Sequence, residues 1–265
     1  MSGNAFVKQT MALTKRELKH WYRSKSQIMM ALVQPLMWLG LFGMMMSGMM
    51  PPEMDFFSTL AMGMVVITAL TTAMNSGMSL IWDRRFGFLD KVRAAPIARG
   101  AIPLSRVLAT TVKALIQCSV VMLIALLLGL NISAFSIWSI PVLLIVIAAT
   151  AMTFSSLFVA FGLVIKNQES FMGINMLMMM PLMFVSGAMF PTSMMQGGNE
   201  ILKAVANFNP LTYAADALRR AFLESEDILS LPDVSMWGCV AILAMFAIAA
   251  TLLGMFFANR ALKKQ

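Results

Sequence analysis

The chain has 265 residues, of which 59% are hydrophobic and 12% charged, and its formal net charge is +8. Soluble domains carry about 25% charged residues, so this composition excludes an ordinary water-soluble domain and indicates an integral membrane protein. Lipid offers the backbone no hydrogen-bond partners, and the alternating segments of a β-barrel are not evident, so the expected fold class is all-α.

Residues 1–27 are predicted to form an amphipathic helix on the inner membrane surface. Leu13, Leu18, Trp21 and Tyr22 recur at roughly helical spacing among basic residues. Such a helix places its aromatic rings at headgroup level. The alternative is an ordered leader to the first membrane span.

Six apolar stretches are long enough, or nearly long enough, to cross a hydrocarbon layer of about 30 Å, which takes about 20 helical residues. We expect membrane spans at Ile28–Met50, Phe57–Ile81, Val107–Leu130, Ile137–Ile165, Phe171–Phe190 and Met236–Ala258.

The basic residues lie mainly in the N-terminal tail, the loop after the second span and the C-terminal tail, whereas the opposite connections are acidic. By the positive-inside rule both termini are predicted to be cytoplasmic, in a multi-pass protein of the cytoplasmic membrane. The surplus charge therefore indicates contact with membrane lipids and not with nucleic acid.

The loop at residues 83–106 is predicted to be the one substantial cytoplasmic connection. Apolar side chains lie among its charges and indicate a short amphipathic helix from near Gly87 to Pro96. Exposed apolar side chains facing the cytoplasm favour a protein partner; the alternative is a helix lying on the bilayer.

The external segment at residues 191–234 is predicted to re-enter the outer leaflet before the last span. Asn199–Phe208 and Thr212–Leu223 have helical patterning, and Asn209-Pro210 separates them. Both pieces are too short to span a membrane and too apolar for a free loop. The whole chain, residues 1–265, is predicted to be a single membrane domain.

The sequence shows no catalytic site. It holds one histidine, His20, and neither a nucleophile elbow nor a P-loop, so any ATP must bind another polypeptide. Cys118 and Cys239 lie in apolar spans and are expected to be core residues, with no cofactor or metal in this chain.

Charge is almost absent from the predicted spans, which contain no Asp or Glu. Ion-driven carriers usually need such carboxylates, so an external energy source is favoured. Lys113 lies about two turns into the third span, where it either extends back to the interface or contributes to a translocation path.

The chain contains 29 methionines. They favour core packing, with two alternatives: an adaptable wall for apolar substrates, or thioether ligands for Cu(I).

Three segments together resemble a known family. The first is Arg16-Glu17-Leu18, leading into a span with Pro35; the second is Asp83-Arg84-Arg85-Phe86-Gly87-Phe88-Leu89-Asp90, followed by Ala95-Pro96. The third is Ser186-Gly187-Ala188-Met189-Phe190-Pro191, followed by Asn209-Pro210-Leu211-Thr212-Tyr213, Asp216 and Arg219. In this order, on six spans, they resemble the permease subunits of type-2 ABC exporters, of the daunorubicin-resistance and nodulation-factor export group.

This resemblance implies that two permease copies pair above two ABC ATPase subunits, which bind ATP-Mg. It implies outward export of a drug-like, lipid or lipid-linked glycan substrate. The ATPase-coupling residues would be Arg84, Arg85, Phe86, Gly87, Phe88, Leu89, Asp90 and Pro96. The external lid would contain Gly187, Pro191, Asn209, Pro210, Tyr213, Asp216 and Arg219.

Asp216 and Arg219 lie at positions i and i+3, so they can pair on one helix face. With Tyr213 they are expected to hold the lid against the sixth span; the alternative is ordinary interface anchoring. The competing functions are an ATPase-independent carrier or channel, a copper-handling membrane protein, and a non-transport scaffold.

Overall fold

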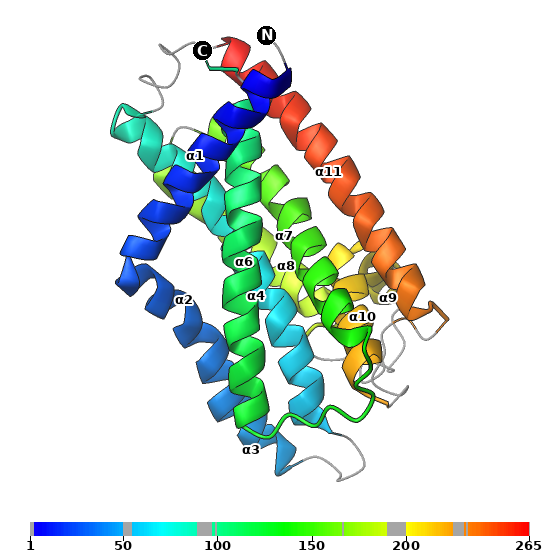
Figure 1. Cartoon of the computed structure of the whole chain (residues 1–265). Coiled ribbons are helices and arrows are strands. Elements are labelled where there is room, and N and C mark those ends of the chain that lie inside the picture. The colour runs from blue at the N-terminus through cyan, green and yellow to red at the C-terminus, as the bar shows by residue number, and fades with distance from the viewer. Residues whose placement is uncertain are drawn as a thin grey trace.

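Figure 1 shows a computed structural model in which long helices run the length of the molecule. The structure describes residues 3–49, 55–88, 97–98, 100–165, 167–189, 200–224, 231 and 233–264. Within these residues all regular structure is helical, which confirms the predicted all-α class.

The helices of the first half begin with α1 on the surface. They are α1 (Gly3–Arg23), α2 (Lys25–Met37), a π-helical turn (Trp38–Gly43), α3 (Met44–Ser47), α4 (Phe56–Arg85) and α6 (Ala101–Leu127). The helices of the second half are α7 (Ser139–Val164), α8 (Gln168–Val185), α9 (Glu200–Phe208), α10 (Pro210–Phe222) and α11 (Met236–Lys264).

Local sequence signals explain where two of the helices begin. The Asp55 carboxylate accepts a hydrogen bond from the Ser58 backbone N–H at 3.0 Å and so caps α4. The Asn209 side chain caps α10 by accepting from the Leu211 N–H at 3.0 Å, and Pro210 occupies the first turn. Asn209-Pro210 therefore breaks the chain between α9 and α10, as predicted from the sequence.

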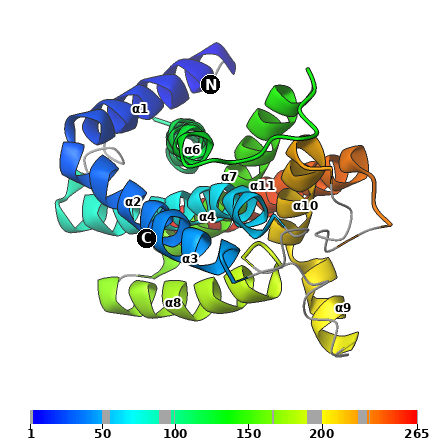
Figure 2. The ribbon, with the colours of Figure 1, turned by 90° about the horizontal axis from the view of Figure 1, so that it is seen from below.

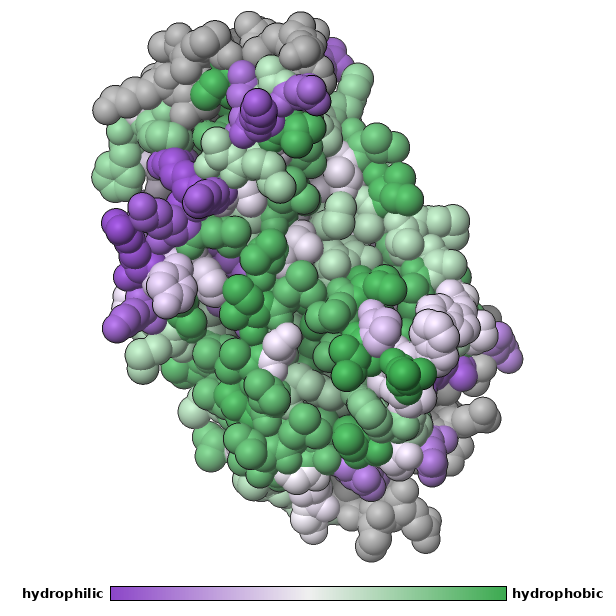
Figure 3. All heavy atoms as spheres, viewed as in Figure 1, coloured by the Kyte–Doolittle hydropathy of each residue, from purple (hydrophilic) through white to green (hydrophobic). Residues whose placement is uncertain are grey.

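Among the described residues, five helices are long and apolar enough to cross a membrane. They are Lys25–Ser47, Phe56–Arg85, Ala101–Leu127, Ser139–Val164 and Met236–Ala258. Each overlaps one of the predicted spans. Figure 3 shows a broad hydrophobic band across the middle of the molecule, with hydrophilic residues along α1 and toward the opposite end. The protein is therefore a multi-pass membrane protein.

The fifth predicted span corresponds to α8, which is not among these five helices because Gln168, Glu169 and Asn175 dilute its apolar character. Its first residue, Gln168, accepts a hydrogen bond from Trp82 near the end of α4, and Ala188 beyond its other end lies beside Gly63. Nineteen α4 residues separate those two points, or about 28 Å of helix. This is the geometry that a sixth crossing requires, and the count of six stays a prediction.

The first predicted span is one transmembrane segment that changes helix type. The turn Trp38–Gly43 is π-helical and follows Pro35, which lies inside α2. Proline removes a backbone donor and disturbs the helix before it, and π-helix occurs mostly as single turns of this kind inside α-helices. Ser24 separates this segment from α1, so the surface helix ends at Arg23 and not at residue 27.

The predicted cytoplasmic loop is shorter than expected. The helix α4 continues to Arg85, and α6 begins at Ala101, six residues before the predicted third span. Pro103 lies in the first turn of α6. Backbone N–H groups in the first turn have no acceptor within the helix, so a proline there costs the helix no hydrogen bond. The connection between the two spans is therefore residues 86–100.

The helix α4 forms the centre of the bundle. Figure 2 shows it surrounded by the other long helices, with α1 and α8 on opposite sides. Glycines allow close contact: a Cβ on Gly77 of α4 would overlap the Phe158 carbonyl of α7, and a Cβ on Gly162 of α7 would overlap the Gly77 carbonyl. Such small-residue contacts are typical of helix packing in membranes.

Candidate functional site

A cluster of charged side chains joins α1, α4 and α6 at one end of the bundle. Its members are Arg16 and Glu17 of α1, Asp83 of α4, and Arg106 and Lys113 of α6; we call it the charge cluster. The Arg106 guanidinium forms ion pairs with both Glu17 and Asp83, and it donates to the Ser79 hydroxyl at 3.0 Å. Three helices are thus tied together by one arginine.

Two further contacts complete the charge cluster. The Lys113 ammonium donates to Glu17 at 2.9 Å, and the Arg16 guanidinium lies 3.8 Å from the Asp83 carboxylate. The side chains of Glu17, Arg106 and Lys113 are 13%, 8% and 15% exposed. These three side chains are therefore largely buried. A charge that is buried in this way must be paired with an opposite charge.

Helical spacing brings these groups together. On α1 the inward positions are Thr10, Thr14, Glu17 and Trp21, at intervals of four, three and four residues. The Thr14 hydroxyl donates to the Ser105 carbonyl at 3.3 Å, which fixes α1 against α6. Leu18 and Tyr22 are also predicted as part of the apolar face. In the structure Leu18 is only partly buried, and Tyr22 is exposed.

Burial and pairing act in opposite directions on Glu17. Burial acts to raise its pKa, but the charges of Arg106, Lys113 and Arg16, with the hydrogen bond from Lys113, outweigh that effect. The pKa of Glu17 is therefore held below its usual value, and the carboxylate stays ionised at neutral pH.

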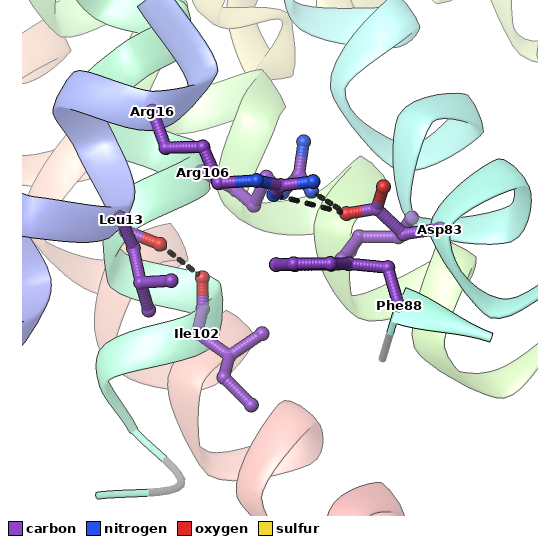
Figure 4. Close-up of a pocket in the computed structure, with 8 residues that line it drawn as sticks. Leu13, Arg16, Asp83, Phe88, Ile102 and Arg106 are labelled. Atoms are coloured by element: carbon purple, nitrogen blue, oxygen red, sulfur yellow. Dashed lines mark hydrogen bonds and ion pairs between the residues drawn. The ribbon is translucent and has the colours of Figure 1, made fainter. Parts of the chain in front are cut away.

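Phe88 connects the charge cluster to the predicted coupling loop. Figure 4 shows Arg16, Arg106 and Asp83 directed toward one another, with the Phe88 ring beneath them. The Arg16 guanidinium carbon lies 3.3 Å from the centre of that ring, a cation–π contact. A movement of the loop at Phe88 would therefore displace Arg16 and, with it, α1.

The other predicted coupling residues do not belong to the charge cluster. Arg84 and Arg85 belong to the last turn of α4, and Arg84 donates to the carbonyls of Leu163 and Ile165 at the end of α7. Phe86 is 79% exposed, and Gly87 adopts a φ of +66°, which ends the helix as a glycine readily does. Leu89, Asp90 and Pro96 lie outside the described residues.

Arg219 of α10 is the centre of a second buried site. Its guanidinium donates to the Gly187 and Ala188 carbonyls at 2.8 and 3.0 Å and lies 3.4 Å from the Asp216 carboxylate. Both side chains are fully buried. The predicted pairing is thus present, and it is joined to backbone groups that the sequence did not indicate.

These contacts tie α10 to the end of α8. Burial lowers the pKa of Arg219, and the nearby Asp216 carboxylate opposes this effect. Asp216 also accepts from the Leu231 N–H at 2.6 Å, on the approach to α11. The sequence predicts that this pair holds the segment against the sixth span, but Arg219 instead binds Gly187 and Ala188, at the end of the fifth predicted span and just beyond α8.

The remaining predicted lid residues surround this site. Tyr213 donates to the Asn207 carbonyl at 2.8 Å, and its ring centre is 6.3 Å from that of Phe246 in α11. The Asn209 amide donates to the Leu182 carbonyl of α8 at 2.9 Å. Gly187 has a φ of +67°, and Pro191 lies outside the described residues. Tyr213 therefore supplies one contact with the sixth predicted span, within a longer interface between α10 and α11.

The charge cluster contains residues that sequence reasoning did not assign to a site. The sequence indicates Lys113 as a candidate, whereas Glu17, Asp83 and Arg106 stand in it only as parts of a motif or a charge run. The signal was present in the spacing of Arg106, Thr110, Lys113 and Gln117, which lie on one face of α6. Among the described residues no group of three His, Cys, Asp or Glu side chains could hold a metal.

Comparisons with known proteins show which family the sequence matches. Residues 8–223 match the model of the ABC-2 type transporter family. The chain is 28% identical to ycf38 of Porphyra purpurea, a candidate transport permease by its name, over 89% of this chain and 84% of that protein.

Two further relatives are named for drug resistance and nodulation. Daunorubicin resistance ABC transporter permease protein DrrB1 of Streptomyces coeruleorubidus is 24% identical over 72% of this chain and 65% of its own. Nodulation protein J of Sinorhizobium fredii is 26% identical over 81% of each chain. Because the family model spans most of the chain, including both buried sites, the protein belongs to the ABC-2 type transporter family.

Proposed function

We propose that the chain is the permease subunit of an ATP-driven exporter that moves an amphipathic molecule outward across the cytoplasmic membrane. Separate ABC ATPase subunits would bind ATP-Mg and dock beneath it. Relatives named as daunorubicin-resistance and nodulation proteins support a drug-like, lipid or lipid-linked glycan substrate.

The charge cluster supports this proposal because of its position. It connects α1 with α4 and α6 at the end where the connection from α4 to α6 emerges. An ATPase that displaces this connection would move Phe88, and with it Arg16 and α1. The exposed ring of Phe86 offers such a partner an apolar contact.

At the opposite end, α10 is locked to the residues after α8 through Arg219. The same helix packs against α4, α7 and α11. A change in helix arrangement that begins at the charge cluster can therefore reach α10 through α4. This supports the role of the external segment as a gate on the outer side.

Pairing of two permease copies belongs to the same proposal. The helices α2, α3 and α8 carry exposed methionines on their outer faces, among them Met29, Met44, Met45, Met176 and Met180. Flexible thioether side chains suit a surface that must repack during a transport cycle. A second copy and membrane lipids are the partners expected there.

The proposal is tested by purifying the tagged chain from its native host in mild detergent. We expect a P-loop ATPase to co-purify, and the reconstituted complex to export a fluorescent amphipathic drug only with ATP. Flux through liposomes that contain this chain alone, without ATP, would overturn the proposal in favour of a carrier or channel.

Phe86→Ala should lower ATPase recovery about tenfold, the loss expected when a contact worth about 1.4 kcal/mol is removed. Phe208→Ala is the matched control, because Phe208 is 81% exposed and lies on α9, far along the chain from the coupling loop. Equal ATPase recovery from both variants would argue against docking at Phe86.

A further inference from the structure

A cavity of about 720 Å³ opens between α1, α2, α4 and α6. Its floor includes members of the charge cluster, and its walls continue along α4 and α6 toward the middle of the bundle.

Two stripes of polar residues line this cavity. The stripe on α4 is Thr72, Ser76, Ser79 and Asp83, and the stripe on α6 is Arg106, Thr110, Lys113 and Gln117. Both follow the same spacing of four, three and four residues, so each occupies one helix face. The helices run antiparallel, and the stripes meet where the Thr72 hydroxyl bonds the Gln117 amide and where Arg106 bonds Ser79.

The stripes extend deep into the membrane region. Eleven residues separate Thr72 from Asp83, and eleven separate Arg106 from Gln117, which is about 16 Å of helix in each case. The polar lining therefore reaches about half-way through a hydrocarbon layer of about 30 Å. Polar residues at such depth are costly and usually mark the path of a substrate.

Three amides in the cavity wall have no side-chain partner among the described residues: Asn75 of α4, and Gln27 and Gln34 of α2. Asn75 is exposed, although its neighbours Met74 and Ser76 on α4 are buried. Each amide can both donate and accept hydrogen bonds. Hydroxyl groups of a bound molecule would satisfy them.

Charge and shape narrow the class of ligand further. The cavity contains three cations, Arg16, Arg106 and Lys113, and two carboxylates, Glu17 and Asp83, which leaves one positive charge in excess. Both carboxylates already pair with cations. On the α2 side the wall includes Met30, which is 74% exposed and continues the apolar outer face of that helix.

We propose that this cavity binds the headgroup of an amphipathic molecule taken from the inner leaflet. The headgroup is rich in hydroxyl groups and carries a single negative charge, and the apolar chain lies along α2 beside Met30. This proposal rests on the proposed export function and names the substrate class that enters it.

The experiment uses the purified chain in mild detergent and native mass spectrometry. The probes are phosphatidylglycerol, which has two hydroxyls and one negative charge, phosphatidylcholine, and phosphatidic acid, which lacks the glycerol hydroxyls. We expect phosphatidylglycerol to be retained about tenfold more than either of the others. Equal retention of all three lipids would overturn the proposal.

Asn75→Leu and Gln34→Leu should each remove most of this preference. Asn175→Leu is the matched control, because Asn175 is an amide in α8 that does not line the cavity. Two substitutions on different helices keep the test decisive if one fails to fold, as judged by gel filtration. Full retention in a folded Asn75→Leu or Gln34→Leu variant would exclude the site.

Two other occupants are distinguished by the same preparation. Free glycerol 1-phosphate that displaces phosphatidylglycerol at equal concentration would show a soluble ligand and overturn the membrane-derived one. A disulfide-linked dimer of Asn75→Cys would show that a second copy fills the cavity. Lipid binding is measured without the ATPase. A lack of lipid binding would therefore overturn the cavity proposal alone, and ATP-driven export is tested separately by the transport assay.

Discussion

At the scale of single residues, two arginines connect distant parts of the chain. Arg106 bonds carboxylates from two other helices, and Arg219 bonds two backbone carbonyls in addition to Asp216. The planar guanidinium has five donors and remains charged, so one side chain can hold several elements at once. Lysine could not replace either arginine without losing contacts.

Asp216→Ala should destabilise the protein strongly. It leaves the fully buried Arg219 charge without its counter-ion, and breaking a buried pair in this way costs about 3–5 kcal/mol. Asp216→Ala/Arg219→Met should cost less than the single change, since no unpaired charge remains. Thermal unfolding in detergent measures both, with the exposed Asp233→Ala as control.

A charge swap at the same pair should not restore stability. A carboxylate at position 219 would face the carbonyls of Gly187 and Ala188, which now accept hydrogen bonds from Arg219. Recovery of the Asp216→Arg/Arg219→Asp variant to native stability would contradict the geometry described above.

Glu17 should make stability depend on pH in the acid range. Its pKa is lower in the folded protein than the usual value of about 4.3, so its contribution is complete above that pH. It is lost as the pH falls through the lower, folded-state pKa. Glu17→Gln should lower stability at pH 7 and flatten the acid limb of a stability–pH curve, whereas Lys15→Gln on the exposed face should do neither.

At the scale of helices, close contact between α4 and α7 determines how the core fits together. Gly77 and Gly162 allow the two backbones to approach, and Gly254 of α11 does the same beside Ser156. The helix α4 also neighbours both buried sites, because its Asp83 belongs to the charge cluster and α10 packs against it. Displacing it would affect the charge cluster and α10 together.

Gly77→Ala should destabilise the bundle by about 1–3 kcal/mol, the usual cost of overpacking a tight core. An added Cβ would collide with backbone and the Phe171 ring, which cannot move aside cheaply. Gly173→Ala is the matched control, because among the described residues no atom outside its own stretch of helix lies within 4 Å of the added Cβ. Equal melting temperatures for the two variants would show that close packing of α4 on α7 does not limit the stability of the bundle.

At the scale of the whole molecule, both ends of the chain lie at the same end of the bundle, as Figure 1 shows. The charge cluster lies toward this end, and α3 lies at the opposite end. An even number of crossings satisfies this arrangement, and five spans plus α8 supply it. Both termini are predicted to face the cytoplasm.

This topology can be tested by cysteine labelling in intact cells. The native Cys118 and Cys239 are buried and free, so they should react little with a membrane-impermeant maleimide. Ile137→Cys, where the side chain is 84% exposed, should be labelled from outside, and Lys15→Cys only after lysis. The reverse pattern would show the opposite orientation.

Much of the fold could be predicted because its signals are local. The length of each apolar run indicated the spans, and Asn209-Pro210 indicated the break between α9 and α10. The bounds of the coupling loop were less predictable, because α4 continues through charged residues that are satisfied by tertiary contacts. Arg84, for example, bonds the end of α7, a partner that no local pattern indicates.

The sequence by itself determined the class of the protein, five of its six predicted membrane segments and its lack of a P-loop, since these depend on composition and short motifs. Only the tertiary structure decided which charges meet. Lys113 and Glu17 are 96 residues apart, and Arg219 is 32 residues from Gly187. Such pairs depend on how the helices pack in three dimensions. Helical spacing determines which face of its own helix a residue occupies, but it does not determine which other helix packs against that face.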